Sequence, residues 1–271
     1  MESSSYSGDY GSLEPLAIRI ETHERLSARA DNPETAVIEA LGMSGDESLL
    51  DVGAGTGSFL RRLRAEGHRG RLVALDSSTA ALEAVNGADS VEAVNADAQR
   101  VPFADLEFDV VTARHMLYHV EDPLAAVREA HRVLGPAGRF VAVVNERDSI
   151  PATRAMLRRI VARHGVELAL DHGAPVHAEN IQAIVASAFV QVRLIEHPNE
   201  LVFSADEDLA RFSTAMLGLY GVPEDSPVRD AVVADLAAEA RRLIDASGGE
   251  LRDPKGYVVA VGFRDDEKYS E

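Results

Sequence analysis

Residues 49–60 have the sequence Leu49-Leu50-Asp51-Val52-Gly53-Ala54-Gly55-Thr56-Gly57-Ser58-Phe59-Leu60. A short apolar run leads into a turn with glycine at every second position, and a helical pattern begins directly after it. Glycine lets the backbone approach a bound molecule closely, so the turn predicts a cofactor loop. A second apolar run, residues 71–75, ends at Asp76, 19 residues after Gly57. In a doubly wound sheet this spacing places a carboxylate beside the turn, within reach of two ribose hydroxyls. The pattern therefore predicts a cofactor that contains a nucleoside.

Two other kinds of glycine loop fit these residues less well. A loop for nucleoside triphosphates needs Lys and then Ser or Thr after its last glycine, but Gly57 is followed by Ser58 and Phe59. The lysines of the chain are Lys255 and Lys268, both far from the turn. A dinucleotide loop has Gly or Ala at the position of Ser58. Serine is small, so this mismatch disfavours a dinucleotide and leaves the alternative open.

A third pattern, an acidic residue followed by G-x-G-x-G, is matched by residues 51–57, and four further blocks follow in order. These blocks are Asn95–Phe103, Phe108–Ala113, His115–Val120 and Arg132–Phe140. On these residues the chain resembles the class I S-adenosylmethionine-dependent methyltransferases, in particular their small-molecule branch. The resemblance covers residues 33–145 well and continues more loosely to residue 264. It implies S-adenosyl-L-methionine as cofactor. That donor carries no phosphate, so no Lys or Arg is required at the turn.

From residue 48 onward, short apolar strands alternate with helical segments, which predicts an α/β fold with a parallel sheet. With the resemblance, this becomes a doubly wound, mostly parallel, seven-stranded Rossmann-like sheet, with an N-terminal helical segment and a helical lid inserted before the last strand. Strands are expected at 48–53, 71–76, 91–95, 107–113, 138–145, 190–196 and 257–263, and helices at 13–31, 33–43, 57–66, 78–86, 122–134, 152–163, 178–187, 206–220 and 227–246. We expect a single methyltransferase domain over 1–264, with a helical cap at 1–43, a cofactor-binding core at 44–145 and the lid at 200–253. An acidic tail, 265–271, follows it.

The resemblance assigns the cofactor to the glycine turn and to the ends of the strands beside it. Asp51 is expected near the ammonium of the donor's methionine portion, directly or through a water; its alternative role is to cap backbone amides of the turn. Asp97 is placed to accept from the adenine amino group, and Ala98 to offer its backbone N–H and packing. Arg114 follows the fourth strand and is a candidate for the donor or a surface residue. The full predicted set is Asp51, Gly53, Ala54, Gly55, Gly57, Asp76, Ser77, Asp97, Ala98 and Arg114.

The candidates for catalysis lie at the exit of the fourth strand, because ligands bind beyond the carboxyl ends of strands in such sheets. In order of preference they are His119, His115 and Tyr118. On a helical turn the two histidines, four residues apart, would share a face. A structural hydrogen bond for His119 and packing for His115 are the alternatives. The pair lacks the Glu of the H-E-x-x-H zinc motif and a third ligand, so no metal is predicted.

The formal net charge of −18 at pH 7 disfavours nucleic acid and anionic membrane surfaces as partners. No apolar run approaches 18 residues and no signal-peptide pattern is present, so we expect a soluble, cytoplasmic protein. The absence of cysteine excludes disulfides and thiolate catalysis.

We expect a transferase that methylates an oxygen or nitrogen of a small-molecule acceptor, in secondary metabolism. Three alternatives remain: a methyltransferase acting on a protein or peptide, an NAD(P)-dependent oxidoreductase, and a non-catalytic S-adenosylmethionine-binding module. The sequence leaves the acceptor and the oligomeric state open.

Overall fold

The computed structural model describes residues 14–85, 90–167 and 175–264, and these divide into two compact units. The first, here called the helical unit, comprises the described residues within 1–31, 148–173 and 198–256. The second, the sheet unit, comprises those within 32–147, 174–197 and 257–271. The predicted acidic tail, 265–271, lies outside the described residues. The other domain boundaries drawn from the sequence stay a prediction.

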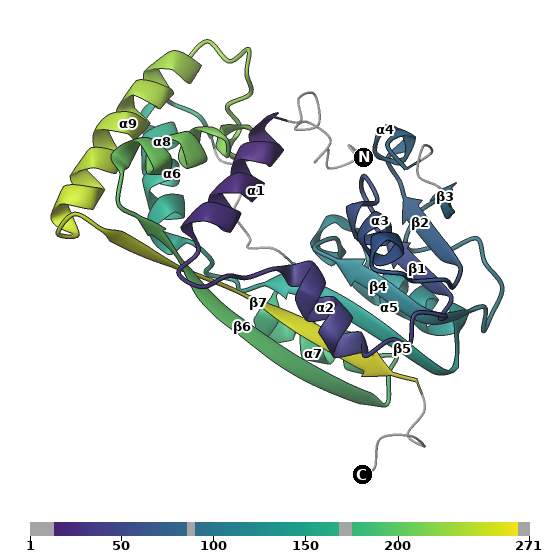
Figure 1. The fold of residues 1–271 in the computed structure, drawn as a ribbon. Coiled ribbons are helices and arrows are strands. Elements are labelled where there is room, and N and C mark those ends of the chain that lie inside the picture. Colours follow the sequence, from purple (N-terminus) through teal and green to yellow (C-terminus); the bar gives the residue numbers. More distant parts are fainter. Residues whose placement is uncertain (1–13, 86–89, 168–174, 265–271) are drawn as a thin grey trace. The chain divides into compact units, whose positions relative to one another are not determined.

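A seven-stranded sheet has the strand order β3-β2-β1-β4-β5-β7-β6 (Figure 1). Its strands are β1 (Leu49–Val52), β2 (Leu72–Asp76), β3 (Val91–Asn95), β4 (Phe108–Arg114), β5 (Leu134–Asn145), β6 (Gln191–Phe203) and β7 (Leu251–Phe263). The first five strands pair in parallel, and β7 pairs antiparallel with β5. The predicted doubly wound, mostly parallel Rossmann-like sheet is therefore confirmed, with an antiparallel seventh strand. The glycine turn follows β1, which lies between β2 and β4 in this order.

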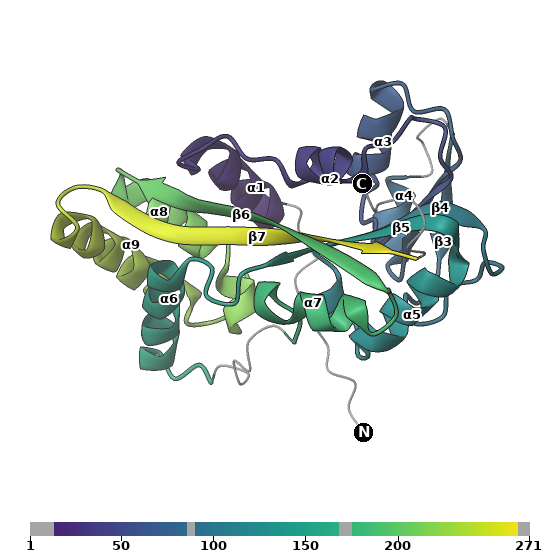
Figure 2. The same cartoon turned by 90° about the horizontal axis from the view of Figure 1, so that it is seen from below.

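Helices cover both faces of the sheet (Figure 2). The helices of the sheet unit are α2 (Pro33–Leu41), α3 (Ser58–Ala65), α4 (Thr79–Glu83), α5 (Pro123–Val133) and α7 (Ala178–Ala186), with the 3₁₀ turn η1 (Leu117–His119). Successive strand residues point to opposite faces, so each strand supplies two cores. Leu50 and Val52 of β1 pack with α5 and α7, whereas Leu49 packs with α2 and α3. The apolar runs of β1, β2 and β4 are thus buried on both sides, as is typical of parallel strands inside a sheet, whereas no residue of the edge strand β3 is fully buried.

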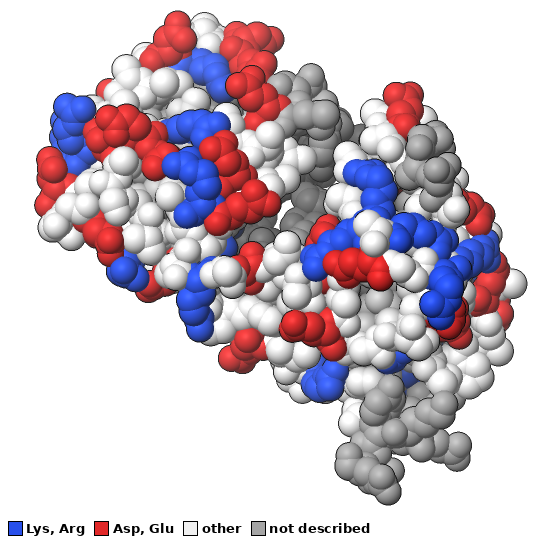
Figure 3. Space-filling model, viewed as in Figure 1, with Lys and Arg blue, Asp and Glu red and all other residues white. Residues whose placement is uncertain are grey.

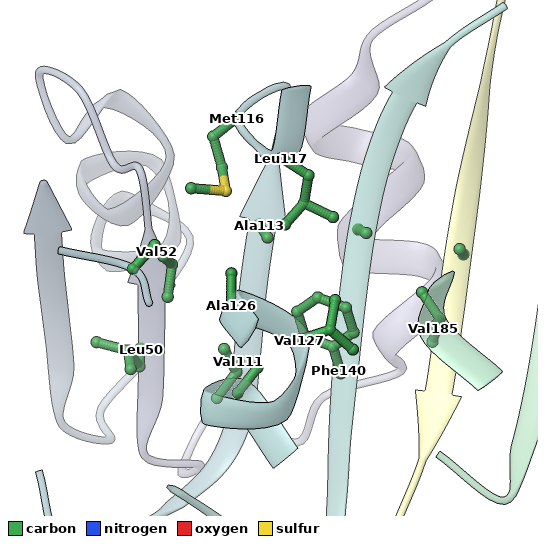
Figure 4. Close-up of a cluster of buried hydrophobic side chains, with 14 of the residues drawn as sticks. Leu50, Val52, Val111, Ala113, Met116, Leu117, Ala126, Val127, Phe140 and Val185 are labelled. Carbon is green, nitrogen blue, oxygen red and sulfur yellow. The ribbon is translucent and has the colours of Figure 1, made fainter. Parts of the chain in front are cut away.

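The core on the α5 side is continuous with the exit of β4 (Figure 4). Val111 and Ala113 of β4 belong to the same buried cluster as Ala126 and Val127 of α5. Burying a valine side chain of this kind stabilises the fold by about 1.5–3 kcal/mol. Met116, just beyond β4, joins this cluster as well. The segment that carries the predicted catalytic residues is therefore anchored in the core.

Short-range capping signals place two helix starts where the sequence predicts them. Asn32 precedes Pro33, and its side chain accepts a hydrogen bond from the Thr35 N–H at 3.0 Å. Asp122 precedes Pro123 of α5 in the same way and accepts from the Ala125 N–H at 3.0 Å. A polar N-cap satisfies one orphan donor, and proline at the first position loses no hydrogen bond.

The helical unit has a hydrophobic core of its own. Its helices are α1 (Glu14–Leu26), α6 (Pro151–Arg163), α8 (Asp206–Thr214), η2 (Leu217–Tyr220) and α9 (Arg229–Ala246). Leu157 of α6, Phe212 of α8 and Leu236 of α9 are fully buried in one cluster. On its surface, acidic and basic side chains alternate (Figure 3), and several are paired, as in the Arg241–Asp206 ion pair at 3.0 Å. The helices expected in the lid therefore pack together with α6 around this core.

The last two strands are much longer than the sequence predicts. We expected strands at 190–196 and 257–263, whereas β6 continues to Phe203 and β7 begins at Leu251. The added segments contain Pro198, Pro254 and Gly256, which are residue types that disfavour a strand when only the local sequence is considered. In the structure the Pro254 carbonyl accepts a hydrogen bond from the Ile150 N–H at 2.6 Å, a contact between distant parts of the chain. The expected helix at 206–220 is also divided, into α8 and η2.

Candidate functional site

The glycine turn after β1 adopts a backbone conformation that favours glycine at all three positions. The φ angles are +69° at Gly53, +55° at Gly55 and +73° at Gly57. The turn is tied to β2 and closed on itself, since the Gly53 N–H donates to the Leu75 carbonyl at 2.8 Å and the Gly57 N–H to the Ala54 carbonyl at 3.0 Å. Left-handed conformations of this kind are strained for residues with a Cβ atom.

The three glycines differ in what a Cβ atom would meet. At Gly53 it would lie 2.6 Å from Cβ of Met116, and at Gly57 2.9 Å from Cγ2 of Val85. These two glycines are therefore required by packing within the protein. At Gly55 a Cβ atom would meet no described atom within 4 Å. As far as the described residues go, the space in front of Gly55 is open, as a turn that contacts a ligand requires.

Asp76 lies beside the turn, as its spacing predicts. One carboxylate oxygen accepts from the Gly55 N–H at 2.8 Å, and the other accepts from the Ser78 N–H at 2.8 Å. Asp76 is half-buried, and the neighbouring predicted residue Ser77 is exposed. Each carboxylate oxygen can accept a further hydrogen bond, so Asp76 is both anchored and able to bind hydroxyls.

The loop after β3 brings the remaining predicted cofactor residues to the same edge of the sheet. The Asn95 side-chain amide donates to the Asp76 carbonyl at 3.0 Å, which ties β3 to β2. Asp97 is exposed and accepts from the Gln99 N–H at 2.8 Å. Ala98 is buried in the core below α5. The structure therefore brings Asp76 and Asp97 to neighbouring strand ends.

Asp51 is fully buried, and its charge is balanced inside the protein. Its Oδ2 accepts from Nη2 of Arg114 at 2.9 Å, and its Oδ1 accepts from the Thr112 hydroxyl at 2.7 Å. The Arg114 side chain retains 14% exposure, and its guanidinium lies 4.3 Å from the centroid of the Phe59 ring. An ion pair at 3.6 Å also connects Arg114 to Glu34 of α2. Two predicted cofactor residues thus form an ion pair at the turn, in which Asp51 is buried and Arg114 is half-buried.

We expected His115 and His119 to share one face of a helical turn, but the segment after β4 is not α-helical. His115 has a φ angle of +51°, and only Leu117–His119 form a helical turn, of the 3₁₀ type. The argument for a shared face of His115 and His119 is therefore wrong, because 3₁₀ geometry has three residues per turn and His115 lies outside it. The His115 backbone N–H donates to the Val143 carbonyl of β5 at 2.9 Å.

The two remaining candidates, Tyr118 and His119, stay at the carboxyl edge of the sheet. Their rings are in edge-to-face contact with centroids 4.5 Å apart. Desolvation lowers the pKa of His119 below its ordinary value, although part of the ring is exposed. His119 is therefore neutral near pH 7, the form that can accept a proton. Its catalytic role stays a prediction.

Two aromatic residues at this edge were missed in the sequence. Tyr257 of β7 is buried, and its ring stacks on His197 of β6 with centroids 4.7 Å apart and an interplanar angle of 5°. The His115 ring lies edge-on to Tyr257 at 6.4 Å. No local sequence pattern predicts that the rings of His115, Tyr257 and His197 lie together, because only the order of strands in the sheet brings β4, β6 and β7 near one another.

A cavity of about 670 Å³ lies within the helical unit, lined by residues of α1, α8 and α9. None of the predicted site residues lines it. Among the described residues, no three His, Asp or Glu side chains are placed to hold a metal ion. None of the helices within 14–85, 90–167 and 175–264 is both long and apolar enough to cross a membrane.

A family model described as a methyltransferase domain matches residues 50–142. The demethylmenaquinone methyltransferase of Staphylococcus saprophyticus is 31% identical over 150 residues, which cover 54% of this chain and 61% of that protein. The YcgJ protein of Bacillus subtilis has a TM-score of 0.56 at 21% identity and covers 86% of this chain and 98% of its own.

A further similar structure is phosphoethanolamine N-methyltransferase 2 of Haemonchus contortus, solved in complex with S-adenosyl-L-methionine. Its TM-score is 0.59 at 17% identity, over 98% of this chain and 61% of that one. At such identities the structural likeness concerns the fold. The chain spans about half to three-fifths of the length of the curated relatives it matches.

Proposed function

We propose that the protein transfers a methyl group from S-adenosylmethionine to a small molecule, on the premise that a methyltransferase-domain model matches residues 50–142, which carry the glycine turn and the parallel strands beside it. The observation that supports this most is the open space in front of Gly55, bordered by the anchored carboxylate of Asp76. A turn of this shape accepts a nucleoside, and its lack of a phosphate-binding lysine suits a donor without phosphate.

We place such a donor along the residues around the turn. Because the strand order is β3-β2-β1-β4, the donor would extend across neighbouring strand ends. Asp97, after β3, would accept from the adenine amino group, and Asp76, at the end of β2, from the ribose hydroxyls. Gly53 and Gly55 would lie against the sulfur-bearing chain, with Arg114 at the end of β4 beyond them.

The acceptor would be held at the carboxyl edge beyond β4, with an oxygen or nitrogen as the methylated atom. The bound donor supplies a methyl group already activated by a positively charged sulfur. The protein then has two tasks: to align the acceptor with the methyl and to exclude water. For a hydroxyl acceptor, His119 would accept the departing proton, and its lowered pKa keeps the ring neutral for that task. A neutral amine would need no base.

The helices between β6 and β7 supply the proposed acceptor lid. These residues, within 200–253, share a core with α6 and α1 in the helical unit. A separate core lets a lid keep its shape while its loops vary with the acceptor. A small-molecule acceptor also accords with the formal charge of −18, which disfavours nucleic acid.

Calorimetric titration with S-adenosylhomocysteine, NADH and ATP tests the proposal. We expect binding of S-adenosylhomocysteine alone. Binding of NADH instead would overturn it in favour of an NAD(P)-dependent oxidoreductase. Methyl-labelled donor with an extract of the source cells should then yield a labelled small molecule. Label found in protein would indicate a protein acceptor, and binding without transfer would indicate a non-catalytic module.

A further inference from the structure

The charged pair at the turn suggests how the amino-acid end of the donor is recognised. The pair consists of Asp51, the acidic residue two positions before Gly53, and Arg114 at the end of β4. The family resemblance predicts that Asp51 lies near the ammonium of the donor and binds it directly or through a water. In the structure, however, Asp51 is 0% exposed and both its oxygens already accept hydrogen bonds. A buried carboxylate without its partner is costly, so Asp51 needs Arg114.

Arg114, in contrast, keeps part of its side chain accessible. Its side chain is 14% exposed, and a guanidinium carries five N–H donors. Asp51 accepts from Nε at 3.4 Å and Nη2 at 2.9 Å, and Nη1 forms a looser ion pair with Glu34 at 3.6 Å. The Phe59 ring fixes one face of the guanidinium at 4.3 Å. The orientation of the Arg114 guanidinium is therefore fixed by Asp51, which precedes the turn, and by Phe59, which follows it.

The strand order places this cation at the correct end of the donor. Asp76 ends β2 on one side of β1, and Arg114 ends β4 on the other side. A donor whose ribose lies on Asp76 and whose chain crosses the turn has its amino-acid end over β4. We propose that Arg114 binds the carboxylate of that end, and that Asp51 is a positioning residue that holds Arg114. This inference rests on the proposed function.

The pair therefore selects donors by their carboxylate. Planar guanidinium groups match carboxylates with two parallel hydrogen bonds, and lysine does not reproduce this geometry. Nucleosides without an amino-acid end gain nothing from Arg114. Decarboxylated S-adenosylmethionine keeps the ammonium and the sulfonium but lacks the carboxylate, so it separates the two roles.

The test compares the dissociation constants of three nucleosides measured by calorimetry. These are S-adenosylmethionine, decarboxylated S-adenosylmethionine and 5′-methylthioadenosine. The unaltered protein should bind S-adenosylmethionine about tenfold to a hundredfold more tightly than the decarboxylated form. In Arg114→Met this ratio should fall close to one, with the affinity for 5′-methylthioadenosine unchanged. Arg114→Lys should keep the charge and lose most of the ratio. Asp51→Asn should reduce the ratio as well.

The matched control is Arg62→Met, because Arg62 also pairs with Glu34 but does not contact Asp51. It should keep the full ratio. Equal affinities of the unaltered protein for the carboxylated and decarboxylated donors would overturn the inference, and this measurement needs no variant. An Asp51→Asn variant that weakens both donors equally would also overturn it, in favour of a direct ammonium contact. Failure of all three nucleosides to bind would instead overturn the proposed function itself.

Discussion

Nδ1 of His23 lies 3.2 Å from Nζ of Lys255 inside the helical unit. An ammonium can only donate, so Nδ1 accepts and the ring is held neutral with its proton on Nε2. Oδ2 of Asp31 lies 3.8 Å from Nζ of Lys255 and balances its positive charge. Burial, with the nearby lysine charge, lowers the pKa of His23 to about 4.

This burial predicts a loss of stability in mild acid. The folded pKa lies below the ordinary value of 6.5, so protonation favours the unfolded chain as the pH falls below 6.5. The contribution of His23 to the free energy of unfolding should decrease by about 2 kcal/mol between pH 7 and pH 5. Urea unfolding at both pH values measures it. The decrease should be smaller by that amount in His23→Gln; an identical decrease in the variant would contradict the assignment.

Asp253 of β7 should be one of the most costly carboxylates to remove. It is 0% exposed and accepts from the N–H groups of Ala152 and Thr153 at 2.9 and 2.8 Å and from the Thr153 hydroxyl at 2.6 Å, which caps α6. Asp253→Ala leaves these donors unpaired and should lower the free energy of unfolding by about 3 kcal/mol. Denaturant unfolding checks this against Asp245→Ala, an exposed position that should change it little.

Gly55 should be the glycine whose substitution removes donor binding without disturbing the core. Gly55→Leu places a side chain in the open space before the turn and should abolish binding of S-adenosylhomocysteine in calorimetry. Gly42 is the matched control, because its φ of +54° is almost the same as the +55° of Gly55. A Cβ atom at Gly42 would also meet no described atom within 4 Å. Gly42→Leu should lose a similar stability, about 1–2 kcal/mol, and keep binding. Retained binding in Gly55→Leu would contradict the assignment of the turn.

His119 should control the acid limb of the pH–rate profile for a hydroxyl acceptor. A base must be neutral, and the lowered pKa of His119 places the loss of activity below pH 6.5. His119→Gln should reduce kcat by about a hundredfold or more, with unchanged affinity for S-adenosylhomocysteine. The control is His164→Gln, since His164 pairs with Asp235 in the helical unit. An acid limb with its midpoint above pH 6.5, or one that His119→Gln leaves unchanged, would argue against His119 as the base.

The parts of the molecule that follow local rules were predictable from the sequence. Glycines at 53, 55 and 57 indicate a turn with left-handed backbone conformations. The pairs Asn32-Pro33 and Asp122-Pro123 indicate the starts of helices. The first four strands end within one residue of the expected positions. For β1, β2 and β4 the reason is that strands buried on both faces are continuous apolar runs. The family pattern depends on these same local features.

The relations between distant residues were decided by the tertiary structure. Asp51 and Arg114 are 63 residues apart, and their pairing depends on β1 lying next to β4. The extensions of β6 and β7, the cap from Asp253 and the stack of His197 on Tyr257 arise in the same way. The sequence by itself determined the turn, the order of strands and helices and the class of cofactor, because these depend on side chains close together in the chain. The tertiary structure alone decided which charge is buried and which stays accessible, because burial depends on what packs against a residue from elsewhere.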